Sequence, residues 1–173
     1  ERGAIVGDAD GRTSVPHVYV IGDAKARNIQ LAHVASAQGE NTVAVIAGKQ
    51  PPLDMSVVPS CVYTNPEIAS VGLTEERAKA DGVSVKTGKY LTGANGKCLI
   101  EGTESGYVKL VTDSASGKLL GAQLVCPRAT DMVGELTLAI QKGLTADELS
   151  AVIHPHPTFS EMLFGAAEGL RQL

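Results

Sequence analysis

Residues 106–126 read GYVKLVTDSASGKLLGAQLVC, and this stretch decides the fold class of most of the chain. It holds two apolar runs, Gly106 to Asp113 and Lys118 to Cys126. Apolar and polar residues alternate along parts of both runs, which is typical of strands that bury one face. The small and polar residues between them, Asp113 to Gly117, indicate a turn. The stretch therefore predicts two neighbouring strands of a sheet.

Similar short runs precede this stretch. The further predicted strands are Val57 to Tyr63, Ile68 to Leu73, Val83 to Leu91 and Lys97 to Glu101. Turn signals such as Asn65-Pro66 and Asn95-Gly96 separate them. Because the strands are grouped and most helices follow them, we predict an α+β domain with an antiparallel sheet and helices on one side.

Four helices are predicted around these strands. Thr74 caps a short helix that runs to Ala80 and has two acidic residues in its first turn. Apolar residues at helical spacing predict a second helix over Ala129 to Lys142, ended by Gly143. The remaining two are Thr145 to Val152 and Ser160 to Leu170.

The first third of the chain has a different pattern. The apolar run His17 to Ile21 predicts a buried strand of a parallel sheet. A predicted helix follows over Leu31 to Ile46. Two prolines in Gly48 to Asp54 indicate an extended connector. We therefore predict two domains, with residues 1–50 as a strand and helix remnant of an α/β domain and residues 54–173 as the α+β domain.

The composition favours a soluble globular protein. The chain has 173 residues, 43% hydrophobic content and a formal net charge of −4. The charge and the lack of a Lys/Arg run argue against nucleic acid as a partner. No apolar run approaches the ~18 residues that a membrane span needs. We therefore expect a cytoplasmic protein with no membrane partner.

The cysteines are odd in number and widely spaced along the chain. They are Cys61, Cys98 and Cys126. This spacing forms neither a disulfide framework nor a CxxC metal or redox pair. We expect buried free thiols, as is usual for unpaired cysteines.

The densest group of chemically active side chains lies in residues 154–161, which read HPHPTFSE. Two prolines restrict the backbone around His156. A rigid histidine followed by Glu161 suits a general acid–base, because the carboxylate sets the tautomer of the ring. Two other interpretations stay open. Thr158 and Glu161 fit a capping box of the last helix, and His154, His156 and Glu161 would supply three ligands of a zinc ion, although a fourth is not evident.

A second candidate site follows the predicted strand. Asp23 lies at the carboxyl end of that strand, where ligands of open α/β sheets bind, and it is suited to accept from ribose-like or polyol hydroxyls. An ordinary Gly-Asp turn is the alternative. The segment Gln30-Leu31-Ala32-His33 opens the next helix, whose N-terminus favours a nearby anionic group. No GxGxxG pattern occurs, so the chain has no dinucleotide-phosphate fingerprint of its own.

Several of these segments together resemble the dihydrolipoamide dehydrogenases, within the pyridine nucleotide-disulfide reductase family. The segments, in order, are Ser14 to Asp23, Leu31 to His33, Asn65 to Thr74, Ala94 to Lys97 and His154 to Glu161. The family carries the pattern HPTxxE, and the preceding His154 produces the H-x-H-P-T-x-x-E form typical of the lipoamide enzymes. Glutathione reductases usually follow the glutamate with a second one, whereas Met162 stands here.

The resemblance implies a role for each matching residue. Asp23 would hydrogen-bond the ribityl chain of FAD. The residues that would lie beside the flavin are Gln30, Leu31, Ala32 and His33. His156 would take a thiol proton from dihydrolipoamide, and Glu161 would orient the ring and stabilise its charge. Electrons would pass through a redox disulfide and FAD to NAD, and no metal is expected.

The resemblance also implies partners. In that family the His–Glu pair serves the active site of the other subunit, which implies a homodimer. The expected substrate is dihydrolipoamide on the acyl-carrier domain of a 2-oxo acid dehydrogenase complex. The family's FAD fingerprint, redox disulfide and NAD domain are absent from these 173 residues, so we expect a C-terminal part of the enzyme that is inactive alone. The alternative is the dimerisation or binding module of another disulfide reductase, of the glutathione reductase kind, without lipoamide chemistry.

Overall fold

The computed structural model describes residues 3–103 and 105–171. The chain divides into two compact units, Glu1–Ser56 and Val57–Leu173. The outermost residues of both predicted domains, 1–2 and 172–173, lie outside the described residues. None of the helices in the described ranges is long and apolar enough to cross a membrane.

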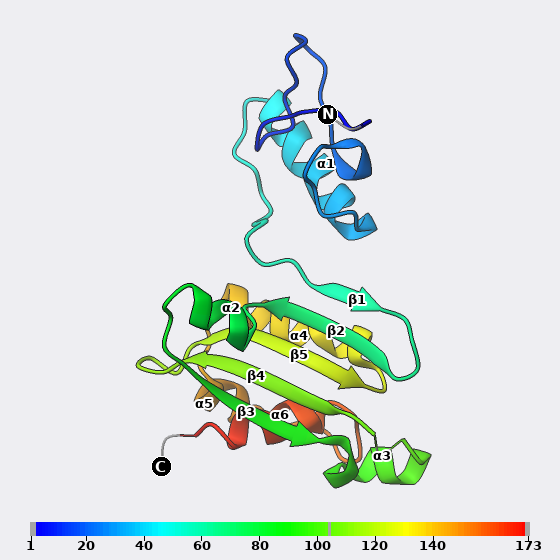
Figure 1. Ribbon diagram of the computed structural model, residues 1–173, viewed down its shortest axis with the longest axis vertical. Coiled ribbons are helices and arrows are strands. Elements are labelled where there is room, and N and C mark those ends of the chain that lie inside the picture. The colour runs from blue at the N-terminus through cyan, green and yellow to red at the C-terminus, as the bar shows by residue number, and fades with distance from the viewer. Residues whose placement is uncertain (1–2, 104, 172–173) are drawn as a thin grey trace. The chain divides into compact units, whose positions relative to one another are not determined.

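An antiparallel five-stranded sheet forms the centre of the second unit (Figure 1). Its strands are β1 Ser60–Val62, β2 Glu67–Gly72, β3 Val85–Leu91, β4 Tyr107–Asp113 and β5 Leu119–Cys126. Their order across the sheet is β1-β2-β5-β4-β3. The β4–β5 pair predicted from residues 106–126 therefore lies inside the sheet, with β2 and β3 on its two sides. The predicted α+β class with an antiparallel sheet is confirmed.

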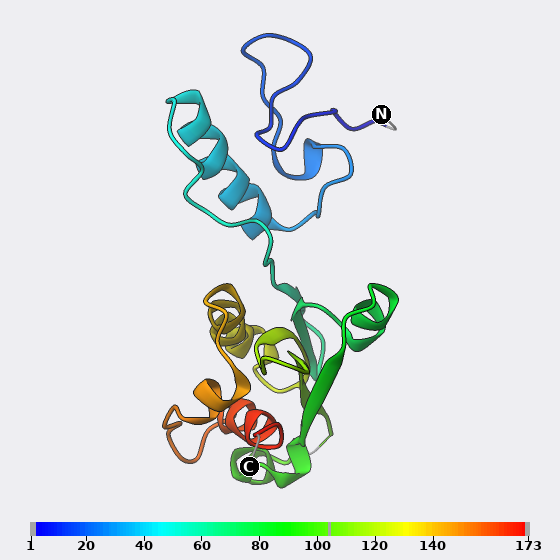
Figure 2. The ribbon, with the colours of Figure 1, turned by 90° about the vertical axis from the view of Figure 1, so that its left-hand side faces the viewer.

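Helices cover mainly one face of this sheet, as the side view shows (Figure 2). The helices are α2 Glu75–Ala80, α3 Gly96–Glu101, α4 Ala129–Gln141, α5 Ala146–Ser150 and α6 Glu161–Glu168. α4 packs on β2 and β5, α6 packs on β3 and β4, and α5 packs on α6. α2 lies on the opposite face. All four helices predicted for this part of the chain are present, and Thr74 caps α2 as expected.

Alternate side chains of the strands build the core together with α4 and α6. The register pairs Val108 with Leu124 and Leu110 with Ala122, so these buried residues share the face that the helices cover. The helices contribute Met132, Val133, Leu136, Ala139, Met162, Leu163, Ala166 and Ala167. Burying one large aliphatic side chain contributes about 1.5–3 kcal/mol. This cluster is therefore the main source of stability of the second unit.

Two glycines allow α6 to lie close to β3. A Cβ atom at Gly88 of β3 would overlap the carbonyl oxygen of Ala166, and one at Gly165 of α6 would overlap the ring of Tyr90. Such overlaps force atoms apart in a close-packed interior. Because α6 begins with Glu161, this packing positions the Glu161 carboxylate relative to β3.

The structure corrects the predicted strand Lys97 to Glu101, which is the helix α3. Asn95 is its N-cap, and its side-chain oxygen accepts from the backbone N–H of Cys98 at 2.9 Å. Gly102 ends the helix in the left-handed conformation, with φ of 65°. In a run this short, an asparagine cap and a glycine stop outweigh a weak strand pattern.

The first unit contains one long helix, α1 Ala32–Ile46, and the 3-10 turn η1 Gly22–Ala24. The helix agrees with the predicted range to within one residue at its start. The run 17–21, predicted as a buried strand, forms no strand: His17 lies in a turn with a φ of 65°, only Val20 of the five residues is buried, and Tyr19 makes an isolated bridge with Arg12. The described residues of this unit contain no strand beside it, and a strand forms only where a neighbour accepts its ladder of hydrogen bonds.

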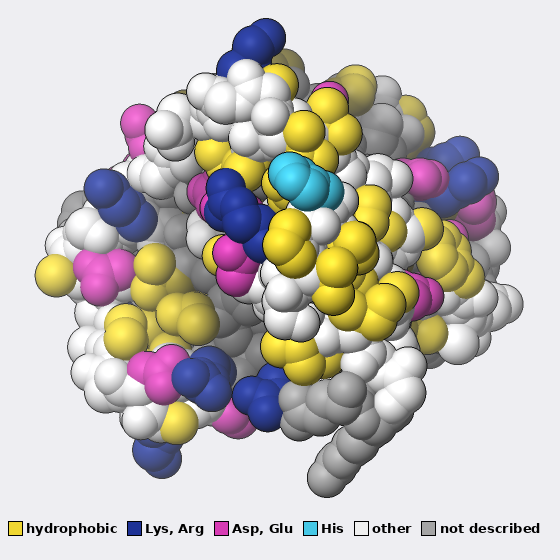
Figure 3. Space-filling view, turned by 90° about the horizontal axis from the view of Figure 1, so that it is seen from above, with side chains coloured by type: hydrophobic (Ala, Val, Ile, Leu, Met, Phe, Trp, Pro, Cys, Tyr) yellow, Lys and Arg dark blue, Asp and Glu magenta, His cyan; other side chains and the backbone are white. Residues whose placement is uncertain are grey.

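Many apolar side chains of the first unit reach the surface, and Figure 3 shows apolar side chains gathered there. The exposed ones in this unit are Ile5, Val6, Val15, Val18, Ile21, Ile29, Val43, Ile46 and Leu53. A cavity of about 250 Å³ also opens between Val20, Gln38 and Met55. Interiors of complete domains are close-packed, so the described residues of this unit do not cover their own apolar surface.

Candidate active site

His156 and Glu161 form the central pair of the candidate site. Nδ1 of His156 lies 2.9 Å from Oε1 of Glu161. The His156 side chain is 75% exposed, whereas the Glu161 side chain is 25% exposed. His156 lies in the loop before α6, and its peptide bond to Pro157 is cis. The structure therefore joins the two residues that the sequence singled out for acid–base chemistry.

The Glu161 carboxylate is held ionised by two neighbours. Its Oε2 accepts from the backbone N–H of Thr158 at 2.8 Å. This bond, followed by the bond with the His156 ring, lowers the pKa of the Glu161 carboxyl below its ordinary value. An ionised carboxylate only accepts hydrogen bonds, so it selects the ring tautomer with the proton on Nδ1. The neutral His156 ring then presents Nε2 as a proton acceptor.

The predicted capping box of α6 is formed only in part. Glu161 does accept from the Thr158 N–H, which is one of the two bonds of a box. The Thr158 hydroxyl, however, donates to the carbonyl oxygen of Pro155 at 2.7 Å. The N-cap residue of α6 is Ser160, which makes no side-chain cap bond. Glu161 thus holds the loop and the His156 ring at the same time.

His154 anchors the other end of the same loop to α4. Its Nε2 lies 3.1 Å from Oε1 of Glu135, and its Nδ1 lies 3.0 Å from the carbonyl oxygen of Val152. The His154 side chain is only 6% exposed, and its ring lies against that of Phe164. The two histidines therefore turn to different carboxylates, one on α4 and one on α6.

This arrangement does not support the zinc interpretation. Across residues 3–103 and 105–171 no group of three or more His, Cys, Asp or Glu side chains is placed to hold a metal ion. His154 pairs with Glu135, so it does not converge with His156 and Glu161 on one point.

Sequence reasoning missed two partners of this loop, Glu135 and Asn95. Glu135 of α4 precedes His154 by 19 residues, and helix α5 lies between them in the sequence. No local sequence pattern indicates that two residues so far apart make contact. Asn95 donates from Nδ2 to the carbonyl oxygen of Thr158 at 3.0 Å. The cap preference of asparagine was a usable signal for α3, but the contact with Thr158 was not visible in the sequence.

The candidate cofactor residues lie in the first unit, around the start of α1. Asp23 is exposed in η1, and Gln30 is exposed in the segment before the helix. Leu31 is the N-cap and supplies no side-chain cap bond. Ala32 and His33 form the exposed first turn of α1.

A small polar network ties η1 to α1. Oε1 of Gln38 accepts from the backbone N–H of Gly22 at 2.8 Å. Asn28 donates to the carbonyl oxygen of Gly22 at 2.8 Å and accepts from Nε2 of Gln38 at 2.7 Å. Gly22 has a φ of 61° and no room for a Cβ atom beside Ala35. The turn that carries Asp23 is therefore fixed to the side of the helix, a feature that sequence reasoning did not find.

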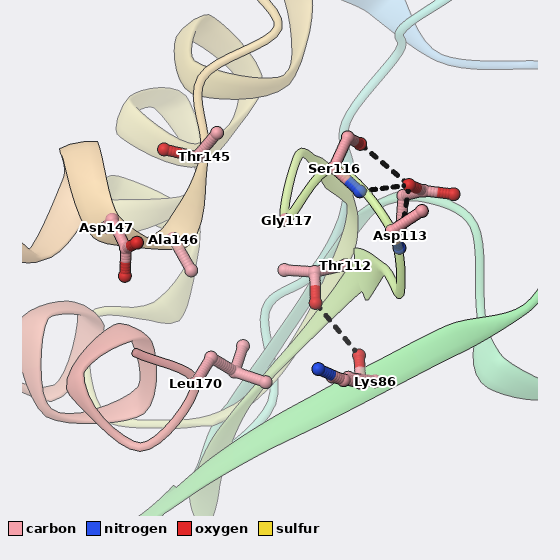
Figure 4. A pocket seen from close by; sticks show the side chains of 10 residues that line it. Lys86, Thr112, Asp113, Ser116, Gly117, Thr145, Ala146, Asp147 and Leu170 are labelled. Atoms are coloured by element: carbon pink, nitrogen blue, oxygen red, sulfur yellow. Dashed lines mark hydrogen bonds between the residues drawn. The ribbon is translucent and has the colours of Figure 1, made fainter. Parts of the chain in front are cut away.

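The second unit also has a small polar pocket of about 100 Å³, shown in Figure 4. Its labelled side chains come from β3, the end of β4 and the turn after it, the start of α5 and the segment after α6. The Asp113 carboxylate there already accepts from Ala115 and Ser116 within the turn. None of the candidate site residues lines this pocket.

The three cysteines are free thiols. Burial raises the pKa of Cys126 to about 12, and it also raises the pKa values of Cys61 and Cys98. Cys98 and Cys126 are buried as expected, whereas Cys61 is only half-buried. Thiols that stay protonated are poor nucleophiles.

Residues 58–167 match the model of the family described as pyridine nucleotide-disulphide oxidoreductase, dimerisation domain. The chain belongs to this family. Residues 1–39 match a second model, described as pyridine nucleotide-disulphide oxidoreductase. The candidate pair His156–Glu161 thus lies in the part of the chain that matches the dimerisation domain, and Asp23 to His33 lie in the other part.

Relatives within this oxidoreductase family include dihydrolipoyl dehydrogenases. The enzyme of Halobacterium salinarum is 45% identical over 166 residues, which are 96% of this chain and 35% of the relative. That of Chlorobaculum tepidum is 46% identical over 168 residues, which are 96% of this chain and 36% of the relative. The chain therefore spans 35–36% of the length of these curated relatives.

Two solved structures have a similar fold. LpdA from Mycobacterium tuberculosis superposes with a TM-score of 0.89 at 26% identity, covering 98% of this chain and 37% of the other. The HOCl-induced flavoprotein disulfide reductase RclA from Escherichia coli has a TM-score of 0.90 at 25% identity, covering 97% of this chain and 39% of the other.

Proposed function

We propose that this chain is the C-terminal region of a dihydrolipoyl dehydrogenase, and that its His156–Glu161 pair is the acid–base group for oxidation of dihydrolipoamide. The single observation that carries the proposal is the 2.9 Å contact between Nδ1 of His156 and the Glu161 carboxylate. It occurs within a chain that is 45% identical to named dihydrolipoyl dehydrogenases.

The geometry suits proton transfer from a thiol. A thiol with a pKa of about 8.5 has to lose its proton to a histidine whose ordinary pKa is about 6.5. The transfer is uphill for an isolated ring, and a carboxylate on the far nitrogen stabilises the imidazolium as the thiolate forms. Glu161 is placed to do this, and the exposed ring leaves Nε2 of His156 accessible to a substrate.

The proposed cofactors are FAD and NAD, bound in the complete enzyme. Asp23 offers an exposed carboxylate for the hydroxyls of the ribityl chain. The start of α1 has no side-chain cap, so its backbone N–H groups and the positive end of its dipole suit an electron-rich ring edge. The segment proposed to lie beside the flavin is Gln30, Leu31, Ala32 and His33. FAD would supply the electron transfer between disulfide and NAD.

The proposed assembly is a homodimer formed through the second unit. The register places five apolar residues in one row across the sheet: Val62, Ile68, Val125, Tyr107 and Leu91. Val62, Ile68 and Leu91 are exposed. An exposed apolar row of this kind is typical of a surface that another protein covers, and the match to a dimerisation domain supports a second copy as that protein.

The proposed substrate is dihydrolipoamide on the acyl-carrier domain of a 2-oxo acid dehydrogenase complex, and the proposed compartment is the cytoplasm. Support comes from the names of the relatives and from the H-x-H-P-T-x-x-E segment. We further propose that this chain is inactive alone, because the family's redox disulfide and dinucleotide fingerprints are not among its residues.

Replacement of His156 in the full-length protein tests the acid–base role. We expect His156→Gln to lower the turnover of dihydrolipoamide by about 10²-fold or more, because a general base is lost. His17→Asn is the matched control, since His17 is an exposed histidine in a left-handed conformation that asparagine tolerates. Turnover within twofold of wild type in His156→Gln would reject the role, and faster reduction of glutathione disulfide than of lipoamide would favour the glutathione reductase alternative.

A further inference from the structure

Asn95 joins the start of α3 to the loop that carries His156. Its side chain is buried, with 2% of the residue exposed. Its Oδ1 atom accepts from the Cys98 N–H at 2.9 Å, and its Nδ2 atom donates to the Thr158 carbonyl oxygen at 3.0 Å. One amide group therefore caps a helix and holds a backbone segment that is 63 residues away.

The Thr158 residue is held at both of its peptide groups. Its N–H donates to Oε2 of Glu161, and its carbonyl oxygen accepts from Asn95. The other oxygen of the same carboxylate, Oε1, contacts Nδ1 of His156. A continuous series of hydrogen bonds thus runs from Asn95 through Thr158 and Glu161 to His156.

The end of the series at Asn95 is itself rigid. The Tyr90 hydroxyl donates to the carbonyl oxygen of Ala94 at 2.8 Å, and the Tyr90 ring packs against Gly165 of α6. A Cβ atom at Gly96 would lie 3.7 Å from Cε1 of His156, so the start of α3 stands beside the His156 ring. Asn95 is therefore fixed to β3 and lies close to the group that it would orient.

We propose that Asn95 is a positioning residue for the His156–Glu161 pair: its amide holds the Thr158 backbone so that the Glu161 carboxylate stays aligned with the ring. This inference rests on the proposed function for its effect on catalysis, while its structural part stands on the hydrogen bonds alone. Asn95 touches neither the reacting nitrogen nor the sulfur, so it acts through Thr158 and Glu161. A misplacement of about 1 Å at a reacting group lowers rates by up to ~10²-fold.

Asn95→Ser in the full-length protein separates the two tasks of the side chain. Serine is as good an N-cap as asparagine, but its hydroxyl is too short to serve both Cys98 and Thr158. Thr74→Ala is the matched control, because it removes the cap of α2, a helix of the same length as α3 without a contact to the loop. Asn95→Asp is the second variant, since it keeps the shape and the cap while turning the Nδ2 donor into an acceptor.

Two measurements are made on wild type and on each variant. The first is hydrogen exchange by mass spectrometry over residues 153–163, where Pro155 and Pro157 carry no N–H and the Thr158 amide is one of nine backbone N–H groups. The second is dihydrolipoamide turnover, resolved into kcat and KM. NADH-dependent reduction of ferricyanide is its control assay, because that reaction needs no proton from a thiol.

If Asn95 positions the pair, Asn95→Ser and Asn95→Asp lose protection in 153–163 and lose kcat by about 10-fold or more. KM and ferricyanide reduction then stay within twofold, and Thr74→Ala changes neither readout. Unchanged protection and kcat in both variants would overturn the inference. A loss of ferricyanide reduction as large as the loss of kcat would also overturn it, because that result indicates a general loss of enzyme structure and not a specific loss of proton transfer. Lost protection combined with full activity of His156→Gln would support the structural link and reject the proposed function.

Discussion

The two units of this chain differ in how much core they build from their own residues. The unit 57–173 buries a continuous cluster of side chains between its sheet and two helices. In the unit 1–56 the buried apolar residues among those described are Val20 and Val34. Both units contain a long helix, α4 in one and α1 in the other. The difference therefore lies in the sheet that the helix packs on.

An amphipathic helix is stable when its apolar face meets a partner surface. α4 meets β2 and β5, whose buried residues come from the same unit. α1 meets the turn η1 and the Ile21 side chain, and nine large apolar residues of that unit stay exposed. The comparison indicates that the second unit is an autonomous folding unit and that the first one depends on further residues for its core.

Separate expression of residues 57–173 and residues 1–56 tests this comparison. Of the predictions made from it, this one has the largest expected effect. We expect 57–173 to unfold in one cooperative urea transition and to be dimeric by light scattering, because it holds its own core and an exposed apolar row. We expect 1–56 to show no cooperative transition. A sharp transition in 1–56, or an unfolded 57–173, would contradict the comparison.

Substitutions on α4 sharpen the comparison within the second unit. Leu136 is fully buried, so we expect Leu136→Ala to lower the free energy of unfolding by about 2–5 kcal/mol. Leu138 is 55% exposed on the same helix. Leu138→Ala should therefore change the free energy of unfolding by less than ~0.5 kcal/mol. Urea titration monitored by circular dichroism measures both. Equal losses for the two leucines would show that α4 does not use the face that the structure assigns to the core.

Glu67 provides a smaller and pH-dependent test. Its Oε2 accepts from the N–H and the hydroxyl of Thr130 at the start of α4, and these bonds lower the pKa of the Glu67 carboxyl below 4.5. A lowered folded-state pKa contributes stability above the unfolded-state value and loses it as the pH falls through the folded-state value. At pH 7 we expect Glu67→Gln to cost about 1 kcal/mol.

This difference between Glu67→Gln and wild type should shrink as the pH falls from 4.5 through the lower folded-state pKa of Glu67, because the carboxyl becomes protonated first in the unfolded and then in the folded protein. Urea midpoints of both proteins between pH 7 and pH 3 measure it. Other carboxyls with lowered pKa values, such as Glu148 and Glu161, are present in both proteins and cancel in the comparison. A difference that grows on acidification would contradict the assigned role of Glu67.

Much of the second unit could be predicted because its signals are local. Alternation of apolar residues marks β4 and β5, and cap residues such as Thr74 and Thr145 mark helix starts within one turn. The prediction failed at Lys97 to Glu101, where a short run was interpreted as a strand although an asparagine cap and Gly102 make it a helix. A run of that length contains too few residues for periodicity to outweigh a cap.

The candidate site divides in the same way. His156 and Glu161 are five residues apart, so the sequence alone indicated that they would meet, and local rigidity from two prolines made the pattern specific. The start of α1 also followed from the predicted helix range, whereas the strand predicted before Asp23 is not formed.

The sequence by itself determined the α+β class, most helix and strand ranges, and the contact between His156 and Glu161, because each depends on residues within a few positions of one another. Only the tertiary structure decided which distant residues support that pair. Glu135 reaches His154 across 19 residues and Asn95 reaches Thr158 across 63. Those contacts exist because β3, α3, α4 and α6 are packed at fixed distances, and a distance in space between remote segments leaves no periodic trace in a single sequence.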